Sequence, residues 1–146
     1  MRKTGVVLLG VLLAAALPGR VTGTPGASPF KVVVNPGVSG GKIKREVLAR
    51  IFLGKAERWG DGKPIVPVDL SSTSLVREAF SAEVLGMRVD GVKAYWLRNV
   101  GTGSWPPKTR ASEQEVLAFV AAEPGAVGYV SEATPVPPTV RVVDVE

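Results

Sequence analysis

Four consecutive hydroxyl residues followed by an arginine form the stretch of this sequence best suited to bind a ligand. Ser71, Ser72, Thr73 and Ser74 lead into a segment whose apolar spacing predicts a helix, and Arg77 lies in its first turn. The first N–H groups of a helix lack intrahelical partners and carry the positive end of its dipole, so an oxyanion could bind them, the hydroxyls and the guanidinium. The alternative is ordinary N-capping with Arg77 on the surface. From the residues alone this alternative is favoured.

The composition excludes most kinds of catalytic site. The sequence contains no cysteine and no histidine, so it has no disulfide, no thiolate nucleophile and neither of two common transition-metal ligands. Asp69, Glu78 and Glu83 are acidic residues near the hydroxyl-rich stretch, but their spacing does not require two carboxylates to meet. Serine hydrolysis would need a lysine or a carboxylate as its base. We therefore predict no enzyme activity, no cofactor and no metal site.

Two further stretches combine residue types found in binding sites. Residues 39–42 (Ser-Gly-Gly-Lys) precede a predicted helix, but Ile43 stands where the phosphate-binding Walker motif has serine or threonine. We interpret this loop as a flexible turn. Residues 105–107 (Trp-Pro-Pro) are either a contact surface for a partner or a rigid loop that covers the core, and the second interpretation is favoured.

Apolar periodicity and turn signals predict the elements that must position these stretches. Gly54 and Gly86 are typical helix stops, and Ser112 with Glu115 forms a capping box that starts a helix. Two prolines near the second strand suggest an edge position or an irregular start. The expected order is a strand at 30–34, a helix at 42–53, a strand at 65–70, helices at 74–85, at 90–100 and from 112, and strands at 126–130 and 140–145.

This order of elements predicts an α/β domain with a mixed sheet of four or five strands and helices on both faces. The hydroxyl-rich loop would then lie where the second strand ends and the second helix begins. Such junctions are common positions for anion sites.

The N-terminal residues have the pattern of an export signal. A basic start, Met1 to Lys3, precedes an uncharged apolar run from Gly5 to Leu17, which is short for a membrane span but typical of a secretory signal peptide. We predict a signal peptide at 1–23 and one domain at 24–146, in the periplasm or secreted; an uncleaved membrane anchor is the alternative. Loss of the signal peptide would take three basic residues from the chain's formal charge of +5, so we predict no nucleic-acid partner.

Three motifs in the domain resemble the phosphate-binding proteins of ABC importers, which have the type 2 periplasmic solute-binding fold. Residues 51–55 (IFLGK) with Trp59 match one signature of that family, and residues 124–130 (PGAVGYV) match another. Between them, residues 66–73 stand where the family has its strand and hydroxyl-rich phosphate loop. The resemblance implies a single-lobe, periplasmic-binding-protein-like domain associated with phosphate transport. It also implies that Ser71, Ser72, Thr73, Ser74 and Arg77 bind phosphate or a similar oxyanion.

The sequence departs from the family in two ways. Family members usually have two lobes that enclose the ligand, whereas this chain corresponds to one, and the glycines of the family's phosphate loop are absent from residues 69–74. We therefore expect weak binding by a monomer, or a cleft completed by a homodimer or by a membrane transporter or envelope partner protein. The alternative function is an accessory protein-interaction module of the cell envelope that kept the fold without the solute site.

Overall fold

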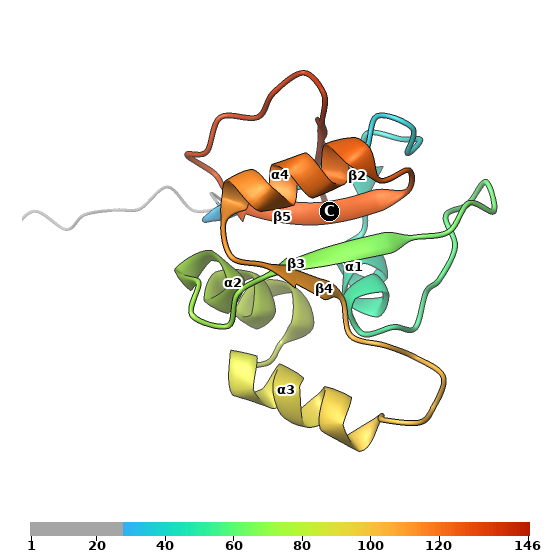
Figure 1. The fold of residues 1–146 in the computed structure, drawn as a ribbon, viewed down its shortest axis with the longest axis vertical. Coiled ribbons are helices and arrows are strands. Elements are labelled where there is room, and N and C mark those ends of the chain that lie inside the picture. Colours follow the sequence, from blue (N-terminus) through green and yellow to red (C-terminus); the bar gives the residue numbers. More distant parts are fainter. Residues whose placement is uncertain (1–27) are drawn as a thin grey trace, which may run out of the picture.

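The computed structural model describes residues 28–146, which form one mixed α/β domain (Figure 1). The predicted signal peptide lies outside the described residues. Among those residues, no helix combines the length and the apolar character needed to cross a membrane. The strands are β1 (Phe30–Val34), β2 (Lys42–Ile43), β3 (Val66–Leu70), β4 (Lys108–Arg110), β5 (Ala126–Ser131) and β6 (Arg141–Val145), and the helices are α1 (Arg45–Phe52), α2 (Leu75–Phe80), α3 (Val89–Arg98) and α4 (Glu113–Ala122), with a π-helical turn at Ser81–Leu85.

The strands form one sheet in the order β2-β6-β1-β5-β3-β4. Strand β1 is antiparallel to both of its neighbours, β5 and β6, whereas β3 is parallel to β5 and to β4. The predicted mixed sheet is therefore confirmed. It has six strands because two very short ones, β2 and β4, are added at its edges.

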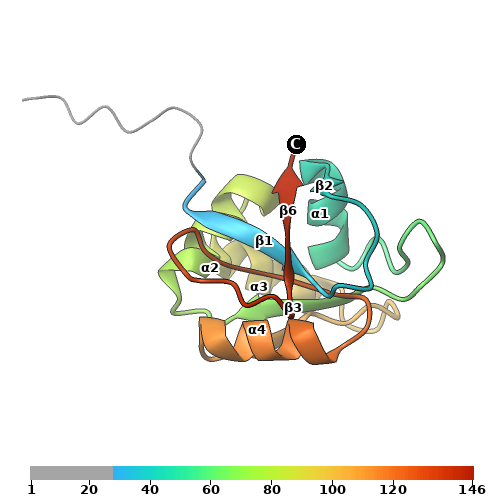
Figure 2. The ribbon, with the colours of Figure 1, turned by 90° about the horizontal axis from the view of Figure 1, so that it is seen from above.

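Helices cover both faces of the sheet, as expected. Figure 2 shows α4 on one side and α1, α2 and α3 on the other. Two consecutive residues of β5 show why: an added Cβ on Gly128 would meet Val116 and Val120 of α4, whereas the next side chain, Tyr129, stacks on Phe80 of α2 with ring centroids 3.9 Å apart. Side chains of a strand alternate between faces, so β5 is buried by a helix on each side.

The N-terminal boundary of the first helix was predicted wrongly. Residues 42 and 43 pair with Asp144 and Val145 of β6 as strand β2, and α1 begins only at Arg45. This pairing joins segments about a hundred residues apart in the chain, so local periodicity carries no signal of it.

The second predicted strand differs from expectation in its position. Strand β3 lies between β5 and β4 rather than at an edge. Strand β4, which was not predicted, pairs only with residues 68–70, so Pro67 has a neighbour on one side alone, at Val127. The alternative prediction, an irregular strand start, accounts for this proline.

The second predicted helix changes character along its length. It begins at Leu75 as an α-helix, continues from Ser81 as a π-helical turn and ends at Gly86, which has a φ of 64°. Its predicted glycine stop is confirmed, and so is the capping box of α4, in which Ser112 and Glu115 each bond the other's backbone.

Candidate functional site

The carboxyl end of β3 holds a buried polar cluster made of Asp69, Arg77 and Tyr129. An Nη atom of Arg77 lies 3.3 Å from a carboxylate oxygen of Asp69, and their side chains are only 12% and 7% exposed. The other carboxylate oxygen accepts hydrogen bonds from the hydroxyl of Tyr129 and from the backbone N–H of Leu70. Asp69 therefore pairs with a cation and a phenol, not with Glu78 or Glu83.

Burial shifts the ionisation of two members of this cluster. Desolvation raises the pKa of Asp69, and the positive charge of Arg77 and the Tyr129 hydrogen bond only partly offset it. The pKa of Tyr129 is also raised, first by desolvation and then by the negative charge of Asp69. Both shifts favour the neutral form of a buried acid, so the phenol of Tyr129 acts as a hydrogen-bond donor.

The loop from Ser71 to Ser74 uses much of its own hydrogen-bonding capacity. The hydroxyls of Ser71 and Thr73 lie 3.1 Å apart and bond each other, while that of Ser74 accepts from the backbone N–H of Arg77 as the N-cap of α2. Ser72 is exposed and lines a groove. The capping interpretation is thus correct for Ser74, and Ser72 is the residue of this loop that lines the groove.

Arg77 is not the surface residue that the capping alternative assumed. One guanidinium N–H donates to the carbonyl of Leu70 at 2.8 Å, and another faces Asp69. Its buried Nε has no acceptor among residues 28–146. The guanidinium therefore ties α2 to the end of β3 and still lines the same groove as Ser72.

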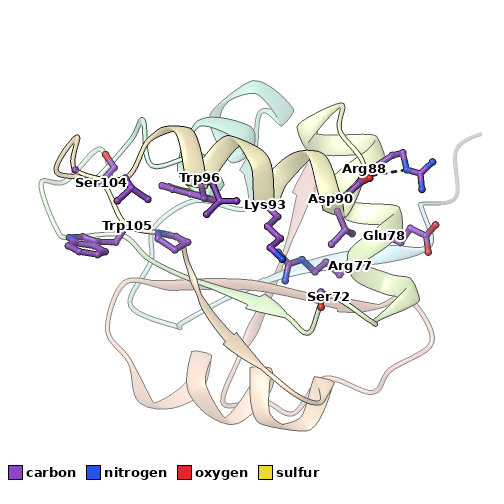
Figure 3. A pocket seen from close by; sticks show the side chains of 14 residues that line it. Ser72, Arg77, Glu78, Arg88, Asp90, Lys93, Trp96, Ser104 and Trp105 are labelled. Atoms are coloured by element: carbon purple, nitrogen blue, oxygen red, sulfur yellow. Dashed lines mark ion pairs between the residues drawn. The ribbon is translucent and has the colours of Figure 1, made fainter.

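That groove has a volume of about 900 Å³ (Figure 3). Helix α2 and the loop before it form one wall, α3 forms a second, and the loop between α3 and β4 closes the end. The lining residues are Ser72, Arg77, Glu78, Arg88, Val89, Asp90, Lys93, Trp96, Leu97, Val100, Gly101, Ser104, Trp105 and Pro106.

Figure 3 shows that Lys93 extends from α3 toward Arg77 and Ser72. Lys93 was not identified as a site residue because its approach to Arg77 depends on how α3 packs. The packing is set by Tyr95, whose hydroxyl donates to the carbonyl of Leu53 at 2.7 Å, and by Trp96, which would meet a Cβ on Gly54 at 2.8 Å. The end of α1 thus positions α3, and with it one wall of the groove.

The exposure of Trp105 contradicts the favoured prediction that residues 105–107 cover the core. Its side chain is 82% exposed, so residues 105–107 do not cover the core and the contact-surface alternative fits better.

The other candidate loop, residues 39–42, leads into β2, where the ammonium of Lys42 pairs with Glu146 at 2.8 Å. No cluster of acidic residues among residues 28–146 has the arrangement of a metal site.

The two signature motifs meet at the opposite end of β3. The indole N–H of Trp59 donates to the carbonyl of Gly125 at 2.9 Å, and the same carbonyl accepts from the backbone N–H of Val66 at 3.1 Å. Gly125 has a φ of 78°, and a Cβ there would lie 2.2 Å from the carbonyl oxygen of Pro64. The contact between Trp59 and Gly125 therefore fixes the start of β3, whereas Gly54 of the first motif lies against the groove wall, where its carbonyl accepts from the hydroxyl of Ser104 at 3.3 Å.

Solved structures of phosphate-transport proteins share this fold. An ABC-type phosphate transport receptor from Vibrio cholerae matches with a TM-score of 0.64 and 19% identity, over 80% of this chain and 46% of its own. A phosphate ABC transporter substrate-binding protein from Clostridium perfringens, solved with bound phosphate, matches with a TM-score of 0.63 and 19% identity over 80% and 44%. PstS from Borrelia burgdorferi matches with a TM-score of 0.64 and 15% identity over 81% and 47%.

These likenesses concern the fold, because each identity is below a fifth and no protein-family model matches the chain. They lend no support to the predicted homodimer. The chain has the α/β fold of the substrate-binding proteins of phosphate ABC transporters, and it spans less than half the length of each of these three.

Proposed function

We propose that this chain is a periplasmic or secreted, substrate-binding-protein-like module that binds phosphate or a similar oxyanion and serves an ABC-type transporter. The observation that carries the proposal is the approach of Ser72, Arg77 and Lys93 within one groove of a fold shared with phosphate-binding proteins. Two cations and a hydroxyl suit a multi-oxygen anion, since charge-assisted hydrogen bonds are stronger than neutral ones.

The affinity of the isolated chain should be low. Ser71, Thr73 and Ser74 already bond within the loop, and Arg77 already bonds Asp69 and Leu70. The open groove leaves an anion partly hydrated, and a ligand site gains affinity by burying most of its ligand. We expect a phosphate dissociation constant near or above about 1 mM, or tighter binding once a partner protein or second copy covers the groove.

Calorimetric titration with phosphate and sulfate tests the proposal. The informative variants are Ser72→Ala and Lys93→Gln, because both residues are exposed and their replacement leaves the buried Asp69–Arg77 pair intact. Lys44→Gln is a matched control, since Lys44 is exposed and outside the groove. We expect both groove variants to weaken binding several-fold and the control to bind as wild type.

Absence of heat with every oxyanion, from a sample that unfolds cooperatively, would contradict the proposal. Measurement of the solution mass with and without phosphate shows whether a second copy supplies the other half of the site. A dimer that forms only with phosphate supports closure by self-association, and a monomer that binds phosphate supports a transporter or envelope partner.

An accessory protein-interaction module is the second candidate. It is favoured by three exposed apolar side chains, those of Leu97, Val100 and Trp105, on the rim of the same groove. This function would require no oxyanion, so the titration that tests the first proposal also separates the two.

A further inference from the structure

The groove is much larger than an inorganic oxyanion requires. Its volume is about 900 Å³, whereas one water molecule occupies roughly 30 Å³ in the liquid and a phosphate ion is only a few times larger. Cavities of about 300–1,000 Å³ are typical of sites that hold organic molecules of drug size. The size alone therefore indicates a ligand with more than an anionic group.

One end of the groove is cationic. Arg88 pairs with Asp90 at 3.6 Å and Arg77 pairs with Asp69, whereas Lys93 has no ion-pair partner among residues 28–146. Figure 3 shows the carboxylate of Glu78 directed away from Lys93. An anion placed between Lys93 and Ser72 would therefore meet a positive charge that the protein itself leaves uncompensated.

The other end of the groove is apolar. Lys93, Trp96, Leu97 and Val100 are spaced three, four and seven residues apart, so they follow one face of α3 and its C-terminal extension. Leu97 and Val100 are 66% and 73% exposed, and Trp105 lies across the groove's end. With a rise of about 1.5 Å per residue, Leu97 lies roughly 6 Å along the helix from Lys93.

We propose, on the basis of the proposed oxyanion function, that the ligand class is an organic phosphate with an aromatic or apolar substituent. The phosphate group binds Lys93, Arg77 and Ser72, and the substituent packs on Trp96, Leu97 and Trp105. Tryptophan faces suit an aromatic substituent because aromatic pairs gain energy beyond the area they bury.

The test compares phenyl phosphate, inorganic phosphate and phenol by calorimetry with the full domain at one ionic strength. We expect phenyl phosphate to bind at least tenfold more tightly than phosphate, and phenol to bind far more weakly than phenyl phosphate. The two variants Trp105→Ala and Leu97→Ser should remove most of that ratio. Leu75→Ser is the control, because Leu75 is 80% exposed but lies outside the groove.

The outcomes separate this inference from the proposed function. Equal affinity for phosphate and phenyl phosphate overturns the organic ligand and leaves phosphate binding standing. Binding of phenyl phosphate without phosphate supports the organic ligand and restricts the function to esters. An affinity ratio that persists in both Trp105→Ala and Leu97→Ser overturns the placement of the substituent, and absence of binding by all three compounds overturns both proposals.

Discussion

The two ends of β3 are stabilised by different kinds of interaction. At its start, Trp59 and Val66 both donate to the carbonyl of Gly125, whose backbone passes so close to Pro64 that no side chain fits. At its end, the carboxylate of Asp69 is buried between Arg77 and Tyr129. The start depends on steric fit and neutral hydrogen bonds, which resist pH and salt. The end depends on charges that have left water and are tolerated only because they are paired.

Removal of the carboxylate should have the largest effect on stability. In Asp69→Ala the buried guanidinium of Arg77 and the hydroxyl of Tyr129 both lose an acceptor. We expect a loss of about 3–5 kcal/mol in the free energy of unfolding, as for other buried pairs deprived of one partner. Urea denaturation measures this loss. Tyr129→Phe keeps the ion pair, so it should lower the free energy of unfolding by less. An Asp69→Ala variant as stable as wild type would mean that the cluster is not buried as described.

A methyl group at the other end of β3 should cost slightly less. Gly125→Ala places a Cβ 2.2 Å from the carbonyl oxygen of Pro64 at a φ of 78°. Left-handed backbone strain and overpacking together should lower the free energy of unfolding by about 2–4 kcal/mol. Gly62→Ala is the matched control, because Gly62 has a φ of 86° but open space around its Cβ position. Equal losses in the two variants would show that backbone conformation alone, and not the contact with Pro64, limits residue 125.

The smallest predicted effect is a pH dependence of the free energy of unfolding, which only the Asp69 end of β3 should contribute. Desolvation raises the pKa of Asp69 in the folded state, so between its ordinary value of about 3.9 and the raised value the folded chain binds more protons than the unfolded chain. The free energy of unfolding should therefore fall across this window as pH rises. Asp69→Asn should lack this component, so its stability difference from wild type should change with pH.

Gly125→Ala provides the control for this measurement. Its stability should stay parallel to that of wild type in urea denaturation at several pH values between about 4 and 7. A pH-dependent difference in Gly125→Ala, or a constant difference in Asp69→Asn, would remove the proposed contrast between the ends.

The parts of the fold that were predicted correctly depend on interactions close in sequence. The capping box of Ser112 and Glu115 joins residues three apart, and the helix stop at Gly86 is a single residue with a positive φ. Strands β2 and β4 have two and three residues, too few to show a period of two, and they exist only because β6 and β3 offer unpaired edges. No local pattern could have predicted them.

The candidate site was predictable to a smaller extent. The sequence placed Ser72 and Arg77 at a strand–helix junction, and they do line one groove. The partner of Arg77 was not predicted, although Asp69 had been noted, and Tyr129 is 60 residues away from Asp69 in the chain. The cationic and apolar wall of α3 was also missed, because α3 is positioned by contacts of Tyr95 and Trp96 with the end of α1.

The central position of β1 has a consequence for the order in which the chain can fold. Strand β1 pairs with β5 on one side and β6 on the other, so both of its neighbours lie about a hundred residues later in the chain. Contacts so distant in sequence raise the contact order and slow folding. Until residues 126–145 are available, the apolar residues of β1 remain without their partners, and the nascent chain is exposed to proteases and to aggregation during that interval.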